Sequence, residues 1–205
     1  MKIKDKNNIL ANLNINENIV IELGCGENKH HLDAIGIDVL DYPSVDIVGD
    51  IYDVLEQFPN GSIDKVFGYH FIEHVPNINR LLLELSRVVK VGGFIEFVAP
   101  HFSNPYFYSD PTHLHFFGLY TFNYFSINSS LQREVPTYQE KLWFQLDHVD
   151  LIFKSSPPFY FRHAFKKTIG LLFNSCGYMR ELYEENFCYL FPCYEVRYKL
   201  SRVAN

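Results

Sequence analysis

The sequence predicts an α/β fold built on a mostly parallel sheet, and two observations carry the prediction. Along the first two thirds of the 205-residue chain, short apolar runs alternate with amphipathic or turn-rich segments, as in a parallel sheet whose connections cover its faces. Glycines or a carboxylate mark the ends of the first three runs. Open parallel sheets bind ligands at such strand ends, so one edge of the sheet is expected to hold the functional site.

Five strands and one long helix are expected in the first hundred residues. The strands are residues 18–23, 34–39, 45–50, 63–71 and 94–100, each a short apolar run bounded by turn residues. The helix is expected at residues 77–90, where aliphatic side chains recur on one face. The sequence Val91-Gly92-Gly93 is expected to end it as a carboxy-terminal cap.

The pattern changes beyond Pro100. Residues 101–125 are rich in aromatic rings, and a short helix is expected at 118–125. Residues 141–154 are typical of a strand or hairpin, and residues 194–203 alternate like a late edge strand. Between these, a proline break precedes a basic, apolar helix candidate at 159–173.

Composition limits the class of protein. The chain is 47% hydrophobic and 17% aromatic, which excludes a disordered protein, and no apolar run approaches the roughly 18 residues of a membrane span. The formal charge of -6 offers no basic footprint for nucleic acid. The first residues lack the apolar core of a secretory signal, so a cytoplasmic location is expected.

The four cysteines follow no metal or redox pattern. None has CxxC spacing, and reduced thiols are expected, with the possibility left open that the last three meet in space. They are Cys25, Cys176, Cys188 and Cys193.

A glycine turn follows the first strand. Gly24 and Gly26 let the backbone turn sharply and approach a ligand at the strand end, although such a pair alone is often only a turn. Asp38 ends the second strand and is expected to accept hydrogen bonds from two ribose hydroxyls. Asp50 ends the third strand, where its carboxylate can bind the exocyclic amine of adenine while the Ile51 amide faces a ring nitrogen. Together these features predict an adenosine site.

The loop after Gly26 lacks the third glycine of the dinucleotide fingerprint. The stretch from Gly26 to Asp38 is also too short for a full crossover helix, which argues against a pyrophosphate on a helix terminus. An adenosine ligand without phosphates fits better, and S-adenosylmethionine is the expected cofactor. A nicotinamide-dependent oxidoreductase is the disfavoured enzyme alternative.

These motifs resemble those of class I S-adenosylmethionine-dependent methyltransferases. The resemblance covers roughly Asn18 to Phe125 and rests on VIELGCGENK, AIGIDV, VGDIYD, IEHVPNINRLLLELSRVVKVGGFIEFVAPHFS and SDPTHLHFF. A segment of the form PHFS...DPTH..FF is similar to a small bacterial branch whose acceptors are mostly unassigned, some of them associated with surface-glycan biosynthesis.

The resemblance implies a Rossmann-like, seven-stranded, mostly parallel sheet with helices on both faces, an antiparallel late strand and an aromatic-rich cap after strand five. It implies one domain over 1–205, with a cofactor-binding core at 18–100, acceptor-binding and cap segments with strand six at 101–193, and a late edge strand at 194–203. Residues 22–26, which include Glu22 and Cys25, would flank the methionine part of the cofactor, and His70 would lie close to it. By the same resemblance, Glu73 and His74 organise the following loop.

The acceptor site is expected in the segment that begins at His101. This residue follows the fifth strand at the same sheet edge as the cofactor loops, and histidine is a natural base near neutral pH. His113 and Asp110 can complete or orient the base, although Asp110 can equally cap a helix that starts at Pro111. His115 is expected to pack. A divalent metal is a further option that the spacing does not require, and none is predicted.

The predicted function is methylation, at oxygen, of a small polar acceptor such as a sugar or a glycan precursor. N-methylation of a small molecule and a non-catalytic adenosine-binding module remain alternatives. The helix candidate at 159–173 is expected to cap the acceptor pocket. A basic apolar helix can also lie on a membrane surface, which would suit a lipid-linked acceptor.

Overall fold

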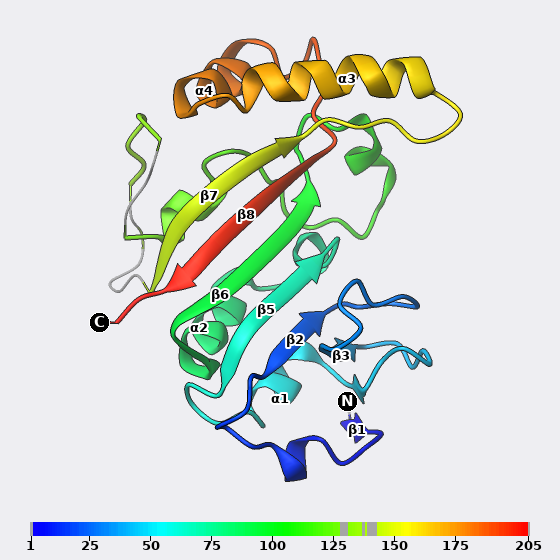
Figure 1. Cartoon of the computed structure of the whole chain (residues 1–205), viewed down its shortest axis with the longest axis vertical. Coiled ribbons are helices and arrows are strands. Elements are labelled where there is room, and N and C mark those ends of the chain that lie inside the picture. Colours follow the sequence, from blue (N-terminus) through cyan, green and yellow to red (C-terminus); the bar gives the residue numbers. More distant parts are fainter. Residues whose placement is uncertain (1, 128–130, 137, 139–142, 205) are drawn as a thin grey trace.

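The computed structural model describes residues 2–127, 131–136, 138 and 143–204. An eight-stranded sheet runs through the molecule in the order β1-β4-β3-β2-β5-β6-β8-β7 (Figure 1). The strands are β1 (Lys4–Asp5), β2 (Val20–Leu23), β3 (Ile35–Asp38), β4 (Ile47–Val48), β5 (Ile63–Tyr69), β6 (Val89–Pro100), β7 (Phe144–Ile152) and β8 (Glu195–Arg202). The helices are α1 (Ile51–Leu55), α2 (Ile78–Val88), α3 (Tyr160–Phe173) and α4 (Gly177–Asn186), with short 3₁₀ helices η1 (Leu10–Asn12), η2 (Ile72–His74), η3 (Pro105–Ser109) and η4 (Thr121–Phe125).

The topology confirms the predicted α/β class. Strands β2 to β6 are mutually parallel where they pair, and β8 runs antiparallel between β6 and β7. The count is eight rather than seven because β1 adds an antiparallel edge to β4. The 194–203 segment is correspondingly not an edge strand, since β8 lies inside the sheet and β7 forms the edge. Residues 141 and 142 of the predicted sixth strand lie outside the described residues.

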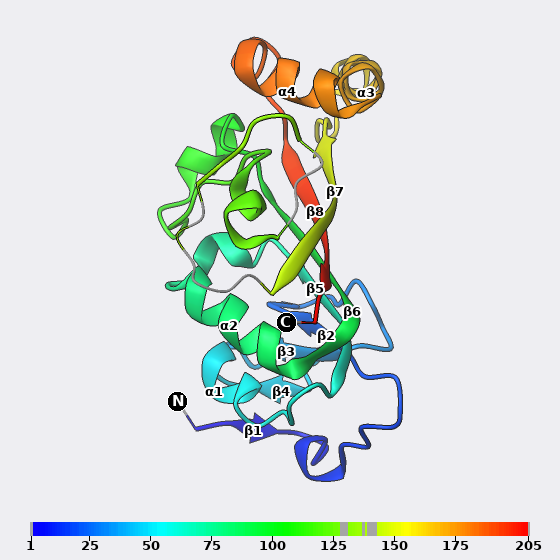
Figure 2. The same cartoon turned by 90° about the vertical axis from the view of Figure 1, so that its left-hand side faces the viewer.

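Helices α1 and α2 lie together on one face of the sheet (Figure 2). The Asn77 side chain caps α2 by accepting a hydrogen bond from the Arg80 amide at 2.9 Å. The apolar stripe of α2 is buried as predicted, through Leu81, Leu82, Leu85 and Val88. Beyond it the prediction fails, because the chain enters β6 directly at Val89 and the two glycines lie inside that strand instead of capping the helix.

Among the described residues, no helix covers the opposite face of the sheet over β2, β5, β6 and β8 (Figure 2). The predicted helices on both faces are therefore met on one face only. The reason is the short connection after Gly26, which leaves room for a loop whose His31 ring stacks on Phe67 at 3.7 Å between centroids. Strand β8 accordingly alternates, with Tyr198 buried on the helix side and Arg197 half-buried on the open side.

Helices α3 and α4 lie beyond the end of β7 and the beginning of β8 (Figure 1). Ile169 and Phe173 of α3 are buried, and Gly170 approaches Phe153. None of the helices among the described residues is long and apolar enough to cross a bilayer.

Candidate functional site

A cavity of about 550 Å³ opens at the carboxyl ends of β2, β3, β4 and β5. This is the edge where open parallel sheets bind ligands, and the volume suits a small molecule. The described residues that line it are Gly24, Ile37, Asp38, Val39, Leu40, Gly49, Asp50, Ile51, His70, Phe71, His74, Val75, Pro76 and Thr112.

Gly24 makes the first turn of the cavity wall. Its φ of +62° lies in the left-handed region, and its amide donates to the Ile37 carbonyl at 2.8 Å. A Cβ at this position would stand 2.6 Å from a ring carbon of Phe71 and 2.9 Å from the Phe71 Cβ. Gly26 also has a positive φ, +57°, but a Cβ there would meet nothing within 4 Å. The close approach at Gly24 is thus to Phe71, and the predicted approach of this backbone to a ligand stays a prediction.

Asp38 lines the cavity and also holds the glycine loop. One carboxylate oxygen accepts from the Gly26 amide at 2.8 Å, and the other accepts from the Leu40 amide at 2.9 Å. A carboxylate oxygen has more than one acceptor site, so the group can still receive hydroxyl hydrogens from a ligand. Its position fits the ribose partner predicted from the sequence.

Asp50 and Ile51 form the next part of the wall. The Asp50 side chain caps α1, with Oδ1 accepting from the Tyr52 amide at 2.9 Å and the Asp53 amide at 3.4 Å. Ile51 is the first residue of α1, where an amide has no acceptor within the helix. Asp50 is therefore both a helix cap and a cavity residue, and these two groups present an acceptor and a donor of the kind that the adenine edge requires.

Glu22 and Cys25 stand behind the loop and are not among the described residues that line the cavity. Glu22 is 1% exposed, and its two oxygens accept from the His30 and His31 amides at 2.9 and 2.8 Å. Burial, with the nearby Asp38 and Glu22 charges, raises the pKa of the Cys25 thiol to about 12. Both residues shape the loop from its far side, and their predicted contact with the cofactor stays a prediction.

His70 stands on the rim with a positive φ of +52°, which is uncommon for a residue other than glycine. Its Nε2 lies 2.9 Å from Glu195 Oε1, and its Nδ1 lies 3.4 Å from Glu73 Oε1. The hydrogen bond to Glu195, with the Glu73 carboxylate as a second negative neighbour, raises the pKa of His70 to about 9. The predicted cofactor-side histidine is therefore a cation at neutral pH.

The segment 110–115 forms the remaining rim. Asp110 caps a turn rather than a helix, because its Oδ1 accepts from the Thr112 amide at 2.8 Å and from the Thr112 hydroxyl at 2.6 Å. These bonds hold the pKa of Asp110 below its usual value. His113 Nδ1 lies 2.9 Å from the Phe107 carbonyl and therefore donates to it, which leaves the Nε2 lone pair free, 3.7 Å from Asp110 Oδ2.

His101, predicted as the base, is fully buried. Its Nδ1 accepts from the Ser103 amide at 3.1 Å, so the ring carries its proton on Nε2, which lies 3.1 Å from a carboxylate oxygen of Glu184. Neither nitrogen has a free lone pair in this arrangement. A direct role in taking a proton stays a prediction for His101. His115, which was expected to pack, donates a hydrogen bond through Nε2 to the Val75 carbonyl at 2.8 Å.

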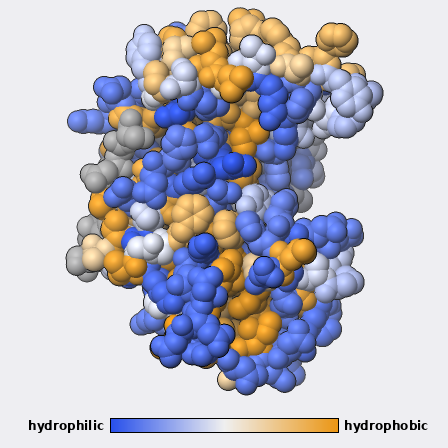
Figure 3. Space-filling view, in the orientation of Figure 1, coloured by the Kyte–Doolittle hydropathy of each residue, from blue (hydrophilic) through white to orange (hydrophobic). Residues whose placement is uncertain are grey.

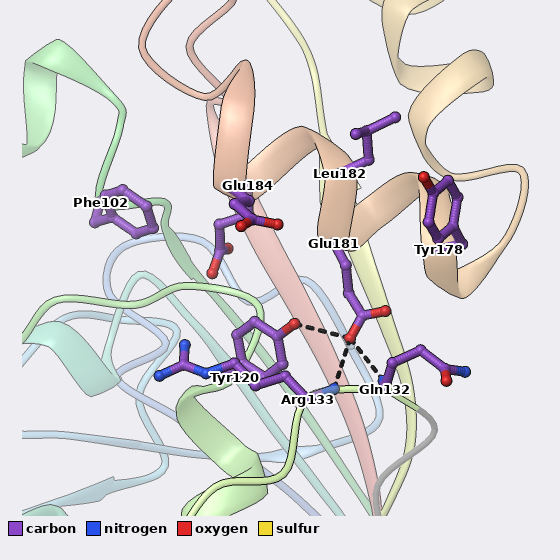
Figure 4. Close-up of a pocket in the computed structure, with 9 residues that line it drawn as sticks. Phe102, Tyr120, Gln132, Arg133, Tyr178, Glu181, Leu182 and Glu184 are labelled. Carbon is purple, nitrogen blue, oxygen red and sulfur yellow. Dashed lines mark hydrogen bonds between the residues drawn. The ribbon is translucent and has the colours of Figure 1, made fainter.

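A second, larger cavity of about 940 Å³ lies between α4 and Phe102, Tyr120, Gln132 and Arg133 (Figure 4). Glu181 faces Tyr120 across it and accepts from the Tyr120 hydroxyl at 2.8 Å and from the Gln132 and Arg133 amides at 2.6 and 3.1 Å. Phe102 and Tyr178 add aromatic faces, and Glu184 and Glu185 add further carboxylates.

The sequence interpretation missed several lining residues and underrated His74, which was expected only to organise a loop. Phe71, Val75, Pro76 and Thr112 also line the cavity, and no spacing in the sequence marks them. The one available signal was position, since residues 71–76 follow β5 directly at the functional edge of the sheet.

The cavity fits an adenosine cofactor on three counts. Its volume is adequate, Gly24 leaves no room for a side chain beside Phe71, and Asp38, Asp50 and Ile51 present polar groups in sequence along the wall. These residues, with His70, would hold S-adenosylmethionine. When bound, that cofactor supplies an activated methyl group on a sulfonium.

Comparisons with known proteins bear on the fold. Residues 21–97 match the family model described as "Methyltransferase domain". A search of curated proteins finds no match. Among solved structures, an S-adenosylmethionine-dependent methyltransferase from Archaeoglobus fulgidus is 19% identical with a TM-score of 0.59, covering 90% of this chain and 86% of that one. The YcgJ protein from Bacillus subtilis is 16% identical with a TM-score of 0.54, covering 92% and 93%.

A phosphoethanolamine N-methyltransferase from Haemonchus contortus, in complex with S-adenosylmethionine, is 13% identical with a TM-score of 0.52. That match covers 92% of this chain and 49% of the other, so it reports the shared fold. The matched family segment, 21–97, contains the glycine turn and the strand-end residues of the cavity up to Pro76. Residues 21–97 of the chain are thus similar to a methyltransferase domain, and the chain shares its fold with S-adenosylmethionine-dependent methyltransferases of known structure.

Proposed function

We propose that this enzyme methylates an oxygen of a small polar acceptor, such as a sugar or a surface-glycan precursor. The observation that supports this most is the free Nε2 lone pair of His113, beside the cavity wall at Thr112 and His74. Methyl transfer to a hydroxyl needs a group that accepts the hydroxyl proton, whereas an uncharged amine needs less assistance. A positioned base at this rim therefore favours oxygen.

In this proposal His113 accepts the proton and Asp110, 3.7 Å away, stabilises the imidazolium that forms. The Phe107 carbonyl fixes the ring by accepting from Nδ1. His101 acts as a positioning residue through Glu184, which also accepts from the Leu119 amide at 2.5 Å. Residues on the 101–119 segment would thus share the acceptor site, as the sequence predicted.

The second cavity supports a sugar-like acceptor. Aromatic rings and carboxylates together suit an amphipathic, hydroxyl-rich ring, with Phe102, Tyr120 and Tyr178 offering faces and Glu181 and Glu185 offering acceptors. The three glutamates of α4 that line this cavity, Glu181, Glu184 and Glu185, favour a second candidate, N-methylation of a cationic amine, because their negative charge would attract the cation.

A lipid-linked form of the acceptor is favoured by α3. Its outer face exposes Phe161 at 95% and Leu171 at 78%, and Figure 3 shows apolar residues gathered over this end of the molecule. Arg162, Lys166 and Lys167 lie on the same helix, which has no acidic residue. Such a helix suits the surface of an anionic bilayer. A cytoplasmic setting belongs to the proposal and is supported by four free cysteines, three of them buried.

The test is an acceptor screen with methyl-labelled S-adenosylmethionine and the full chain. Free sugars, nucleotide sugars and amino sugars are compared, and mass spectrometry locates the methyl group on oxygen or nitrogen. Oxygen products are expected, with kcat falling about 10²- to 10⁴-fold in His113→Gln and unchanged binding of S-adenosylhomocysteine. His148→Gln, a histidine on β7 beside Asp150, is the control. Labelling confined to amines would favour the second candidate and contradict the first.

A further inference from the structure

Three side chains that can act as metal ligands lie close together at the rim of the cofactor cavity. Glu73, His74 and His113 each offer one ligand atom, and these atoms lie within 4.8 Å of one another. They come from η2 and from the 110–115 segment, which are joined by the bond from the Leu114 amide to the Glu73 carbonyl at 2.7 Å. The backbone therefore holds the two sources of the cluster against each other.

The Glu73 carboxylate is the unusual member. It is fully buried, and neither oxygen has a hydrogen-bond partner among the described residues. His70 is near, with Nδ1 at 3.4 Å from Oε1, but its closer bond is to Glu195 at 2.9 Å. The His70 cation thus stands beside Oε1 only, and Oε2 of this fully buried carboxylate has neither a hydrogen bond nor an ion pair among the described residues. A second cation at Oε2 would offset the cost of burying that charge.

The two imidazoles are oriented as metal ligands. His113 Nδ1 donates to the Phe107 carbonyl at 2.9 Å. The Thr112 hydroxyl donates to Asp110, so it accepts from His74 Nδ1 at 3.0 Å. Both rings thus carry their proton on Nδ1 and keep the Nε2 lone pair. A histidine ligand held by a hydrogen bond from its other nitrogen is the usual arrangement around protein-bound metals.

We propose that Glu73, His74 and His113 bind one divalent transition-metal ion of the Zn²⁺ or Mn²⁺ type at the rim of the cofactor cavity. Two imidazoles and one carboxylate suit these ions, whereas Mg²⁺ and Ca²⁺ prefer oxygen ligands. Ligand atoms around Zn²⁺ stand roughly 3.4 Å apart at bond lengths of about 2.1 Å. Modest side-chain rotations from the present spacing of up to 4.8 Å reach that geometry.

The ion would also serve the reaction, and this part rests on the proposed function. His74 lines the cofactor cavity, so an open position on the ion lies at its edge. An acceptor hydroxyl bound there would lose its proton more readily, because a divalent cation lowers the pKa of a bound oxygen. His113 is then a ligand, and the ion takes over the task that the metal-free chain leaves to the His113 lone pair.

The experiment uses the full untagged chain, stripped with a chelator and titrated with Zn²⁺ in one series and Mn²⁺ in another. Bound metal is counted by elemental analysis after dialysis, and affinity is measured by calorimetry. One ion per chain is expected, with affinity about 100-fold weaker in both Glu73→Gln and His113→Gln. The His148→Gln control retains the wild-type affinity. Binding by the two cluster variants that equals wild type, or an equal loss in the control, overturns the site.

Thermal unfolding separates a ligand from a structural ion-pair partner. Without metal, Glu73→Gln is expected to unfold at the same temperature as wild type or higher, since it removes a fully buried charge whose contact with His70 is long, at 3.4 Å. Added Zn²⁺ should raise the midpoint of wild type but not of Glu73→Gln. If Glu73→Gln unfolds at a lower temperature than wild type without metal, and Zn²⁺ does not raise the midpoint of wild type, Glu73 is an ion-pair partner of His70 and not a metal ligand.

Two readouts keep this inference distinct from the proposed function. Metal binding is measured without acceptor, and S-adenosylhomocysteine binding is measured on the stripped chain, where it should persist. Methyl transfer to oxygen that is unaffected by chelation overturns the catalytic role of the ion while the metal count still decides the site. If the chain binds the metal but transfers no methyl group either with metal or without it, the proposed acceptor is wrong and the metal site is not contradicted.

Discussion

Replacement of Gly24 by alanine tests the cofactor cavity most sharply. The φ of +62° makes any side chain unfavourable there by about 1–2 kcal/mol. The new Cβ would also stand 2.6 Å from Phe71 Cδ2 and 2.9 Å from Phe71 Cβ. The second contact is not with the flexible end of a side chain, so Phe71 must shift as a whole, at about 1–3 kcal/mol.

Gly26→Ala is the matched control in the same loop. Its φ of +57° carries the same backbone penalty, but nothing lies within 4 Å of the added Cβ. The two variants therefore differ by the Phe71 overlap alone, about 1–3 kcal/mol. Phe71 lines the cavity and can relieve the overlap with the new Cβ by moving into the cavity. A ligand that binds in the cavity must push Phe71 back against that Cβ, so the overlap weakens ligand binding.

Calorimetry with S-adenosylhomocysteine measures the difference. Gly24→Ala should bind roughly 5- to 150-fold more weakly than Gly26→Ala, which is the same energy expressed as affinity. Gly61→Ala, with φ +57° in an open turn before β5, should lose stability without losing affinity. Equal affinities for Gly24→Ala and Gly26→Ala would refute the assignment of this wall to the cofactor.

Thiol labelling and vesicle binding check two other parts of the structure. Ellman's reagent at neutral pH should react rapidly with one thiol per native chain, the exposed Cys176, because burial raises the pKa of the Cys25 thiol to about 12; a rapid phase that survives Cys176→Ser contradicts this. Phe161→Ser should weaken co-sedimentation with phosphatidylglycerol vesicles, whereas Leu83→Ser, an equally simple change at a 56% exposed site on α2, should not. Equal losses in both variants would argue against α3 as the membrane face.

The strand ends were predictable because their signals are local. An apolar run followed by a glycine or a carboxylate is visible in five or six residues, and Gly24, Asp38, Asp50 and Ile51 all lie where that signal placed them. Parallel strands bring such ends to one edge whatever the connections do. The wall of the cavity therefore follows from short stretches of sequence.

The segment that begins at His101 was less predictable because burial is set by distant residues. His101 follows β6 at the expected place, but Glu184, 83 residues later, and Ser103 occupy both of its ring nitrogens. Glu22 shows the same limit, since its partners are the amides of a loop that replaces a helix. The sequence pattern predicts where such a side chain lies along a strand. The hydrogen-bond partners of its polar atoms depend on segments far away in the sequence.

The antiparallel strand β8 explains why the rim carries so much charge. A parallel strand begins at the edge opposite the cavity, but β8 runs the other way and begins beside the ends of β5 and β6. Its first residue, Glu195, therefore meets His70, 125 residues earlier in the chain, and also pairs with Lys154 just after β7. With His70 bonded to Glu195, the neighbouring Glu73 is left without a hydrogen-bond partner among the described residues. The reversal of one strand thus places a carboxylate beside the cofactor cavity and frees a second one for a cation.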